Sequence, residues 1–237
     1  MNYILLNADD ISKDGKTVIL KDRRLEHIRQ IIKPVLGDSL RVGLRDGKLG
    51  AGRVADLQAK ALVLDDLLLE KNPPAKLPLT LILALPRPPV LKRILLHGTA
   101  VGVPKIYLIQ TNRVEKSYWQ SPALKEGNME EQLILGLEQG GDTVLPEIFL
   151  KKRFKPFVED ELPLLSQNSM KLLAHPDEAE KCPYQVNKPI TLFIGPEGGF
   201  VPFEVDLLEK NGFRAVTIGS RPWRVEAIVF GLIARLF

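Results

Sequence analysis

Residues that bind metals or carry redox chemistry are scarce in this sequence. Its 237 residues include one cysteine, Cys182, and three histidines. One cysteine excludes an intrachain disulfide framework, and no group of cysteines and histidines has the spacing of zinc ligands. The scattered histidines also leave no serine–histidine–acid arrangement to assemble. We therefore expect no metal, and we interpret Cys182, beside Pro183 in a predicted loop, as incidental rather than nucleophilic.

Long hydrophobic runs are also missing. No apolar stretch approaches the length needed to cross a bilayer, and Met1 to Asn7 lacks the basic start and long apolar centre of a secretory signal. We expect a cytoplasmic protein with no membrane partner. The 45% hydrophobic content supports a core large enough for one large domain or two small ones.

Two common nucleotide-binding motifs are absent as well. The chain has no Walker A pattern and no dinucleotide GxGxxG fingerprint, because its glycine-rich run at 195–199 has a different spacing. A nucleoside triphosphate or a nicotinamide cofactor is therefore not expected.

The formal net charge of +4 is mildly basic, and its distribution is more informative than its sum. Basic side chains gather in two separate stretches of the chain. The candidates for phosphate contact are Arg23, Arg24, Arg29, Lys33, Arg87, Lys92, Arg93 and Arg113. One basic stretch alone is more typical of a solvated face. Two of them together make phosphate binding about as plausible as a solvated surface.

The first 70 or so residues have the pattern of a small β-rich domain. Strands are predicted at 18–20, 39–43, 50–55 and 61–64, and one helix at 25–32 that Pro34 ends. Such a pattern suggests a small barrel, a shape that often binds nucleic acid. A polar, proline-rich linker follows at 71–78. We therefore divide the chain into a first domain, 1–72, and a second domain, 73–237.

Strands alternate with helices in the second domain. Strands are predicted at 81–85, 105–109, 147–150, 171–174, 191–194 and 215–218, and helices at 90–101, 129–139, 157–167, 203–211 and 225–236. This alternation predicts an α/β domain with a parallel sheet. The last helix is so apolar that the core or a partner must cover it.

Three loops that follow predicted strands carry the residues most suited to chemistry: 175–178, 195–200 and 219–226. In 195–200, Gly-Pro-Glu-Gly-Gly-Phe, the glycines allow close approach of a ligand to the backbone, which favours a ligand loop over an empty turn. In 219–226, two arginines, a tryptophan and Glu226 precede a helix. The segment is equally compatible with a plain helix start. In that alternative Glu226 lies at the positive end of the helix dipole, and both arginines are in solvent.

These residues together resemble a known family. The run 193–200, then Glu204, Gly219, Arg221, Arg224 and Glu226, is similar to the ribosomal small-subunit uridine-N3 methyltransferases of the SPOUT superfamily. The resemblance covers the whole chain. It implies an α/β fold with a SPOUT-type parallel sheet and a C-terminal trefoil knot, preceded by a PUA-like β-barrel that binds RNA. It also implies a homodimer through the C-terminal helix.

The activity implied by this resemblance is methyl transfer from S-adenosylmethionine to a uridine N3 in ribosomal RNA or the small ribosomal subunit. The cofactor would contact Leu173, Ala174, His175, Gly195, Glu197, Gly198, Gly199, Ile218, Gly219, Ser220, Trp223 and Val225. Arg224 and Arg221 would stabilise the uracil or its phosphate, and Glu226 would orient one of them or accept the N3 proton. The eight basic residues named above would then contact RNA.

The chain also departs from the family pattern. Ser220, Pro222, Trp223, Val225 and Ala227 replace its usual residues in the last loop. Other departures are His97, Ala100, Asp142 and Lys33. These changes leave two alternatives open: a divergent paralogue that modifies another RNA site, and an RNA-binding knot protein without catalysis.

Overall fold

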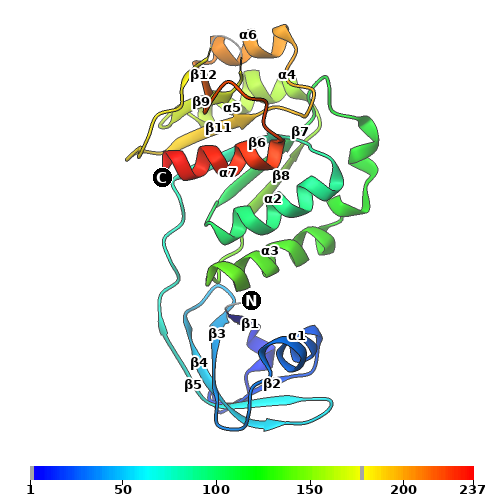
Figure 1. Cartoon of the computed structure of the whole chain (residues 1–237), viewed down its shortest axis with the longest axis vertical. Helices are drawn as coiled ribbons and strands as arrows, with labels where there is room; N and C mark the ends of the chain where they lie inside the picture. Colours follow the sequence, from blue (N-terminus) through cyan, green and yellow to red (C-terminus); the bar gives the residue numbers. More distant parts are fainter. Residues whose placement is uncertain (1–2, 177–178) are drawn as a thin grey trace. The chain divides into compact units, whose positions relative to one another are not determined.

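The computed structural model describes residues 3–176 and 179–237, and Figure 1 traces the chain. Asp177 and Glu178, which belong to the expected loop 175–178, lie outside the described residues. The chain forms two compact units. Unit 1 comprises Met1–Ala75 and Ile134–Leu145, and unit 2 comprises Lys76–Leu133 and Pro146–Phe237. The expected domain boundary after residue 72 stays a prediction.

Unit 1 contains a curled five-stranded sheet in the order β1-β3-β4-β5-β2. Its strands are β1 (Ile4–Leu6), β2 (Val18–Leu20), β3 (Ser39–Leu44), β4 (Leu49–Leu57) and β5 (Leu62–Lys71). β1 runs parallel to β3 and the other pairs are antiparallel. The β4–β5 pairing shifts register three times, and such irregularities bend a sheet. β1 and the second half of β5 were missing from the predicted strands.

A helical segment covers the core of this sheet. α1 (Arg23–His27) continues into a π-helical turn, η2 (Ile28–Ile32), which confirms the predicted helix at 25–32 with an earlier start. The Asp22 carboxylate caps α1 by accepting the Arg24 N–H at 2.9 Å. Leu25 and Ile28 are buried against side chains from all five strands. A short 3-10 turn, η1 (Ala8–Asp10), follows β1.

Arg24 belongs to the core of unit 1 rather than to its surface. The residue is 5% exposed, and its guanidinium donates to the Leu5 carbonyl and to the carboxylates of Asp10 and Asp22 at 2.6–3.1 Å. Guanidinium has five N–H groups, and these contacts occupy all of them. Arg24 is therefore unavailable to an RNA phosphate, and it is not among the RNA contacts that we propose for this protein.

The later segment of unit 1, Ile134–Leu145, is joined to the β-sheet by a second buried charged side chain. α3 (Glu126–Gly140) ends in this segment. Its Glu138 has a fully buried side chain, which accepts from the Leu5 N–H at 3.4 Å and from the Arg23 guanidinium at 3.3 Å. Burial raises the pKa of the Glu138 carboxyl, and the charge of Arg23 opposes that rise. Unit 1 is thus completed by residues that lie far along the chain.

Unit 2 is built on a parallel seven-stranded sheet in the order β10-β12-β9-β11-β6-β7-β8. The strands are β6 (Leu79–Ala84), β7 (Lys105–Ile109), β8 (Glu147–Lys151), β9 (Met170–Ala174), β10 (Glu180–Lys181), β11 (Ile190–Ile194) and β12 (Arg214–Thr217). Every pairing among them is parallel, as the alternating pattern predicted. The two-residue β10 was not predicted.

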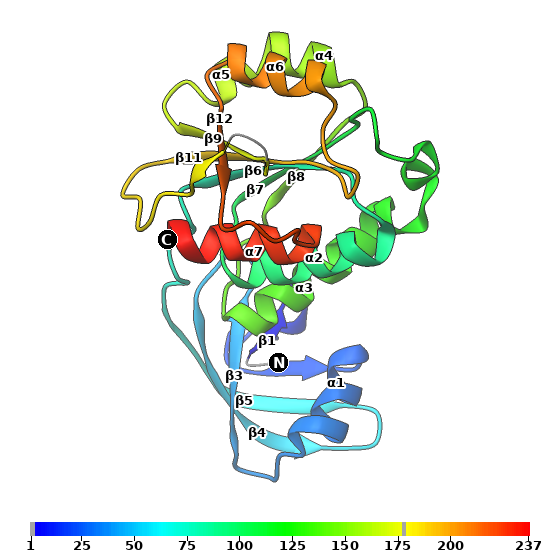
Figure 2. The ribbon, with the colours of Figure 1, turned by 45° about the horizontal axis from the view of Figure 1, so that its top comes forward.

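Helices cover both faces of this sheet, so that unit 2 has three layers (Figure 2). α2 (Pro88–Ala100) and α7 (Val225–Leu236) lie on one face. α6 (Pro202–Lys210) lies on the other with the helical segment α4 (Phe154–Pro156), η5 (Phe157–Glu161) and α5 (Leu162–Leu165). Two 3-10 turns, η3 (Lys116–Gln120) and η4 (Pro122–Leu124), follow β7. The expected α/β class with a parallel sheet after a small β unit is confirmed.

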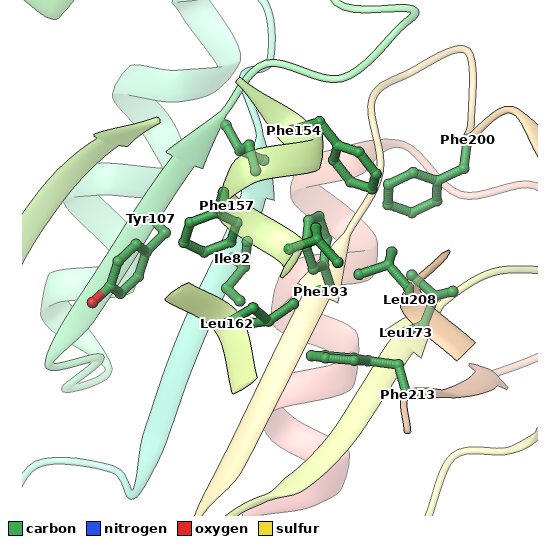
Figure 3. Close-up of a cluster of buried hydrophobic side chains, with 12 residues drawn as sticks. Ile82, Tyr107, Phe154, Phe157, Leu162, Leu173, Phe193, Phe200, Leu208 and Phe213 are labelled. Atoms are coloured by element: carbon green, nitrogen blue, oxygen red, sulfur yellow. The ribbon is translucent and has the colours of Figure 1, made fainter. Parts of the chain in front are cut away.

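An aromatic cluster fills the space under α4, α5 and α6 (Figure 3). Phe193 of β11 is at its centre, with the rings of Phe154, Phe200 and Phe213 at edge-on angles and centroid distances of 5.6–6.2 Å. Edge-to-face contacts of this kind add to the free energy of simple apolar burial. Because Phe200 directly follows the glycine-rich run 195–199, the cluster anchors that loop to the core.

Two absences concern the described residues only. None of the helices formed by 3–176 and 179–237 is long and apolar enough to cross a membrane. Within the same ranges, no three His, Cys, Asp or Glu side chains gather in a way that could hold a metal ion.

The buried ion pairs of unit 1 lead to a stability prediction. Arg24→Leu removes the partner of two carboxylates and of a buried carbonyl, and we expect it to lower the free energy of unfolding by about 2 to 4 kcal/mol. Arg53 is the matched control, because it also pairs with two aspartates, Asp65 and Asp66, but is half exposed. Arg53→Leu should cost about 0.5 kcal/mol. Urea unfolding followed by circular dichroism measures both, and equal losses would contradict the structural role of Arg24.

Candidate functional site

Three loops of unit 2 meet because the strands before them end level with one another. Ala174, the last residue of β9, lies opposite Ile194 of β11 on one side and Val216 of β12 on the other. The three strands are parallel, so the chain leaves all of them at the same edge of the sheet. This edge, at the carboxyl ends of the strands, is where open α/β sheets bind ligands.

The glycine-rich loop after β11 is closed on itself. The Gly199 N–H donates to the Pro196 carbonyl at 2.8 Å, and Gly199 has φ +72°, which favours glycine. The Phe200 ring folds back over Gly195 so closely that a Cβ on Gly195 would lie 2.8 Å from it. The loop therefore has little freedom, and its backbone faces outward at Glu197 and Gly198, both exposed.

Neighbouring segments hold this loop from the side of β7. The buried Glu204 carboxylate accepts the Asn112 N–H at 2.7 Å and the Val201 N–H at 3.1 Å, which joins the loop after β7 to the start of α6. Arg113 donates to the carbonyl of Gly198. From the same side, Glu197 accepts the backbone N–H of Arg87, which follows β6, at 3.2 Å. The glycine-rich loop is thus fixed by charged side chains as well as by the aromatic core.

The loop after β12 is tied to the end of its own strand. The Thr217 hydroxyl bonds the carbonyl of Gly219 at 2.8 Å and lies 3.3 Å from its N–H. Trp223, later in this loop, is 51% exposed. In the loop after β9, the backbone N–H of His175 donates to the Val216 carbonyl at 3.3 Å. The described part of each of the three expected loops therefore has at least one hydrogen bond that fixes it to a strand end or to another part of its own loop.

A cavity of about 370 Å³ lies between the three loops. This volume is within the range of small-molecule sites. Its wall comprises Arg113, Ala174, His175, Pro176, Ile194, Gly195, Pro196, Glu197, Gly198, Gly199, Phe200, Val216, Thr217, Arg221, Pro222, Trp223, Val225 and Ile228. Apolar side chains, exposed peptide groups and two arginines thus line one space, which suits a ligand with apolar and polar parts.

Most of the expected cofactor contacts line this cavity. They are Ala174, His175, Gly195, Glu197, Gly198, Gly199, Trp223 and Val225. The other four lie beside it. Leu173 points into the aromatic cluster, Ile218 packs against Gly231 of α7, and Gly219 and Ser220 are exposed in the loop after β12. For Leu173, only its backbone is left to meet a ligand.

The expected catalytic residues divide between the cavity and its rim. Arg221 lines the cavity, whereas Arg224 is exposed directly before α7. Glu226, in the first turn of α7, accepts from Arg93 of α2 at 2.9 Å. The pKa of the Glu226 carboxyl is lowered by its own backbone N–H and then by Arg93 and Arg224. Glu226 is therefore an anion at neutral pH, held between two helices.

The basic residues expected to contact RNA also occupy different environments. In unit 1, Arg23 and Arg29 line a second cavity with Lys21 and Lys60, and Arg29 donates to the Ala59 carbonyl at 2.8 Å. Lys33 is exposed and ends η2 with φ 52°. In unit 2, Arg87, Lys92 and Arg93 are exposed on or before α2. Arg113 differs from these, because its guanidinium is bonded to the glycine-rich loop.

Several cavity residues were missed by the reading of the sequence. For seven of them, closeness in the chain to expected residues was the available signal. These residues are Ile194, Pro196, Phe200, Val216, Thr217, Pro222 and Ile228. Arg113 is 85 residues from Gly198, so no local pattern could connect the two. Lys60, in a turn between strands, reaches the basic cavity of unit 1 only through the fold.

Comparison with known proteins identifies related sequences. Residues 73–236 match the model of a family described as RNA methyltransferase domain. Ribosomal RNA small subunit methyltransferase E of Treponema pallidum is 29% identical over 230 residues, which cover 95% of this chain and 86% of that protein. Ribosomal RNA small subunit methyltransferase E 1 of Borreliella burgdorferi is 29% identical over 235 residues, which cover 95% of this chain and 93% of that protein.

Solved structures share the fold. Ribosomal RNA small subunit methyltransferase E from Neisseria gonorrhoeae, bound to S-adenosyl methionine, superposes with a TM-score of 0.72 at 21% identity, covering 98% of this chain and 96% of that one. A methyltransferase from Legionella pneumophila, in complex with the same cofactor, superposes with a TM-score of 0.72 at 23% identity. The match covers 98% of this chain and 95% of that one. At these identities the likeness concerns the fold.

The closed glycine-rich loop leads to a second prediction. Gly195→Ala places a methyl group against the Phe200 ring, which is buried and cannot move away freely, so we expect a loss of about 1 to 3 kcal/mol in the free energy of unfolding. Gly219→Ala is the control, because a Cβ added at Gly219 would meet no atom within 4 Å. Thermal unfolding of the two variants compares them. A Gly195→Ala protein as stable as Gly219→Ala would show that Phe200 does not hold the loop.

Proposed function

The chain belongs to the RNA methyltransferase domain family, and from that premise we propose that it methylates small-subunit ribosomal RNA with S-adenosylmethionine as methyl donor. The observation that carries the proposal is the cavity between the loops after β9, β11 and β12. The names of the relatives from Treponema and Borreliella support the ribosomal RNA substrate. The Neisseria structure, which binds S-adenosyl methionine, supports the cofactor.

The residues present fit this cofactor. Gly195, Gly198 and Gly199 carry no side chains that would fill the cavity, and the peptide groups beside them could bond an adenine. The apolar wall, which includes Ile194, Val225 and Ile228, could cover the ring. When bound, S-adenosylmethionine supplies a methyl group activated by a sulfonium. We assign cofactor binding to the twelve residues expected from the sequence, Leu173 by its backbone.

The chain's own side chains must bind the target uridine and deal with its N3 proton. Uridine N3–H is weakly acidic, so loss of this proton leaves an anion that nearby cations stabilise. We assign Arg221, in the cavity wall, and Arg224, at its rim, to the uracil or its phosphate. Glu226, ionised and paired with Arg93, either orients Arg224 or accepts the proton.

The basic side chains of both units supply phosphate contacts in this proposal. In unit 1 they are Arg23, Arg29, Lys33 and Lys60, of which three line one cavity. In unit 2 they are Arg87, Lys92 and Arg93. Phosphate contacts position an RNA without reading its sequence. The first domain, 1–72, would serve mainly this purpose, and the second, 73–237, would carry the methyl-transfer site.

A homodimer through α7 and a C-terminal trefoil knot complete the proposal. An apolar groove along α2 and α7 is lined by Leu77, His97, Val101, Phe230, Ile233, Ala234 and Phe237. A second copy of α7 would cover such a groove and remove its apolar surface from water. The knot is supported by the family resemblance and by the position of β9 between β11 and β12.

Nucleoside analysis of ribosomal RNA tests the proposed function. In a strain that lacks the gene, N3-methyluridine should disappear from small-subunit RNA and return when the wild-type gene is supplied. Arg224→Ala should lower the rate of methylation about 100-fold, as expected when a group that stabilises developing charge is lost. Arg214→Ala is the matched control, because this exposed arginine lies on β12 before the cavity and pairs with Glu180 at 3.8 Å.

Each contrary outcome has its own meaning. An unchanged N3-methyluridine content in the deletion strain would contradict the ribosomal uridine assignment, and loss of a different methylated nucleoside would identify a divergent paralogue. No change in any methylated nucleoside would favour the RNA-binding protein without catalysis. Full methylation by Arg224→Ala would remove Arg224 from the proposed site while leaving the function in place.

A further inference from the structure

An aromatic and basic surface lies beside the proposed cofactor cavity, on the segment that follows β7. This segment, 110–120, ends in the 3-10 turn η3. The Trp119 indole N–H donates to the side-chain oxygen of Gln110, and the Gln110 amide in turn donates to the carbonyls of Thr111 and Val114. Trp119 is partly exposed, so this network fixes the position of a ring that solvent can reach.

Cations accompany the two aromatic rings of this segment. The Lys152 ammonium, which follows β8, lies 5.8 Å from the centroid of the Trp119 ring. Tyr118 donates its hydroxyl proton to Glu115 at 2.9 Å and accepts a hydrogen bond from the Arg87 guanidinium. Cations near aromatic rings in this way favour contact with a partner that has both charge and π-faces.

The charge of the surface is positive. Contacts place the cations Arg87, Arg113 and Lys152 and the acids Glu115 and Glu197 on it, and two further basic residues, Lys116 and Arg153, adjoin Glu115 and Lys152 in the chain. Both acids are bonded, Glu115 to Tyr118 and Glu197 to the backbone N–H of Arg87. The basic side chains are exposed. A protein partner with an apolar patch would gain little here, whereas a polyanion with planar bases matches both the charge and the rings.

This surface is continuous with the cavity. Arg113 belongs to the same segment and also lines the cavity, where it bonds the Gly198 carbonyl. Arg87 is linked to the cavity wall through Glu197. A nucleotide strand whose target base is at the cavity would therefore pass over η3 with its neighbouring nucleotides.

We propose that Trp119, Tyr118 and Lys152 form a binding platform for single-stranded RNA next to the target uridine, with a nucleobase stacked on Trp119 and phosphates at Lys152 and Arg87. The platform rests on the proposed RNA methyltransferase function and adds a substrate-binding site to it. Stacking on an aromatic ring tolerates any base. The platform would therefore hold the strand, and the cavity would select the uridine.

Methylation kinetics test the platform. The substrate is small-subunit ribosomal RNA from a strain lacking the gene, with saturating S-adenosylmethionine. Trp119→Leu should raise the KM for RNA about tenfold, equivalent to about 1.4 kcal/mol, with kcat unchanged. Lys152→Gln should raise the KM for RNA about threefold. Because Lys152 is exposed, this change spares the fold. The controls are Tyr184→Leu, whose ring has Arg235 at the same 5.8 Å, and Lys155→Gln, whose partner is Glu159.

Tryptophan fluorescence provides a readout that a structural role would not move. The chain has two tryptophans, Trp119 on the platform and Trp223 in the cavity wall. In Trp223→Phe, oligouridylate should quench the emission of Trp119. In Trp119→Phe, S-adenosylmethionine should change the emission of Trp223, which lines the cavity.

The outcomes separate the platform from the proposed function. If the wild type methylates RNA but both platform variants keep its KM, or if oligouridylate leaves Trp119 emission unchanged, the platform is wrong and the function stands. If a protein rather than RNA quenches Trp119, the surface has been assigned to the wrong class of partner. If the wild type neither binds S-adenosylmethionine nor methylates RNA, the proposed function itself fails.

Discussion

The site depends on one constraint: the parallel strands β9, β11 and β12 must end at the same level of the sheet. Ala174 lies opposite both Ile194 and Val216, so a shift of β9 by one residue would move its following loop away from its neighbours and turn its side chains to the other face. The strands that pair here, β9 with β11 and β9 with β12, are not consecutive along the chain. The site therefore exists only when the central part of the sheet is complete, and the apolar side chains of β9, β11 and β12 serve the cavity indirectly by holding the register.

Packing behind the loops converts this register into a defined cavity. Phe193 and Phe200 bring the aromatic core up to the glycine-rich loop, and the buried Glu204 carboxylate accepts the backbone N–H groups of Asn112 and Val201 beside it. Arg113 adds a bond from the loop after β7. A preformed cavity loses less conformational entropy when a ligand binds. The same contacts lead outward from the cavity to Arg87 and Trp119, which makes the proposed RNA platform an extension of one network.

Local patterns in the sequence were sufficient for much of the fold. The apolar run at 191–194 and the glycines after it predicted β11 and its loop, and the alternation of strands and helices predicted the parallel sheet. The order of the strands was out of reach, because the pattern along a chain does not state which strands pair. For the same reason the packing of Ile134–Leu145 in unit 1 was not foreseen. Arg24 illustrates a further limit: a basic side chain has the same sequence signal whether it is solvated or enclosed by carboxylates.

Calorimetric titration with S-adenosylmethionine tests the central claim, that the space between the loops after β9, β11 and β12 binds the cofactor. The wild-type protein should bind one molecule per chain. Ala174→Leu, which places a larger apolar group in the wall of the cavity, should weaken binding at least tenfold while thermal unfolding stays unchanged. Absence of binding by the wild type at millimolar ligand, or equal affinity in the two proteins, would contradict the assignment of this cavity.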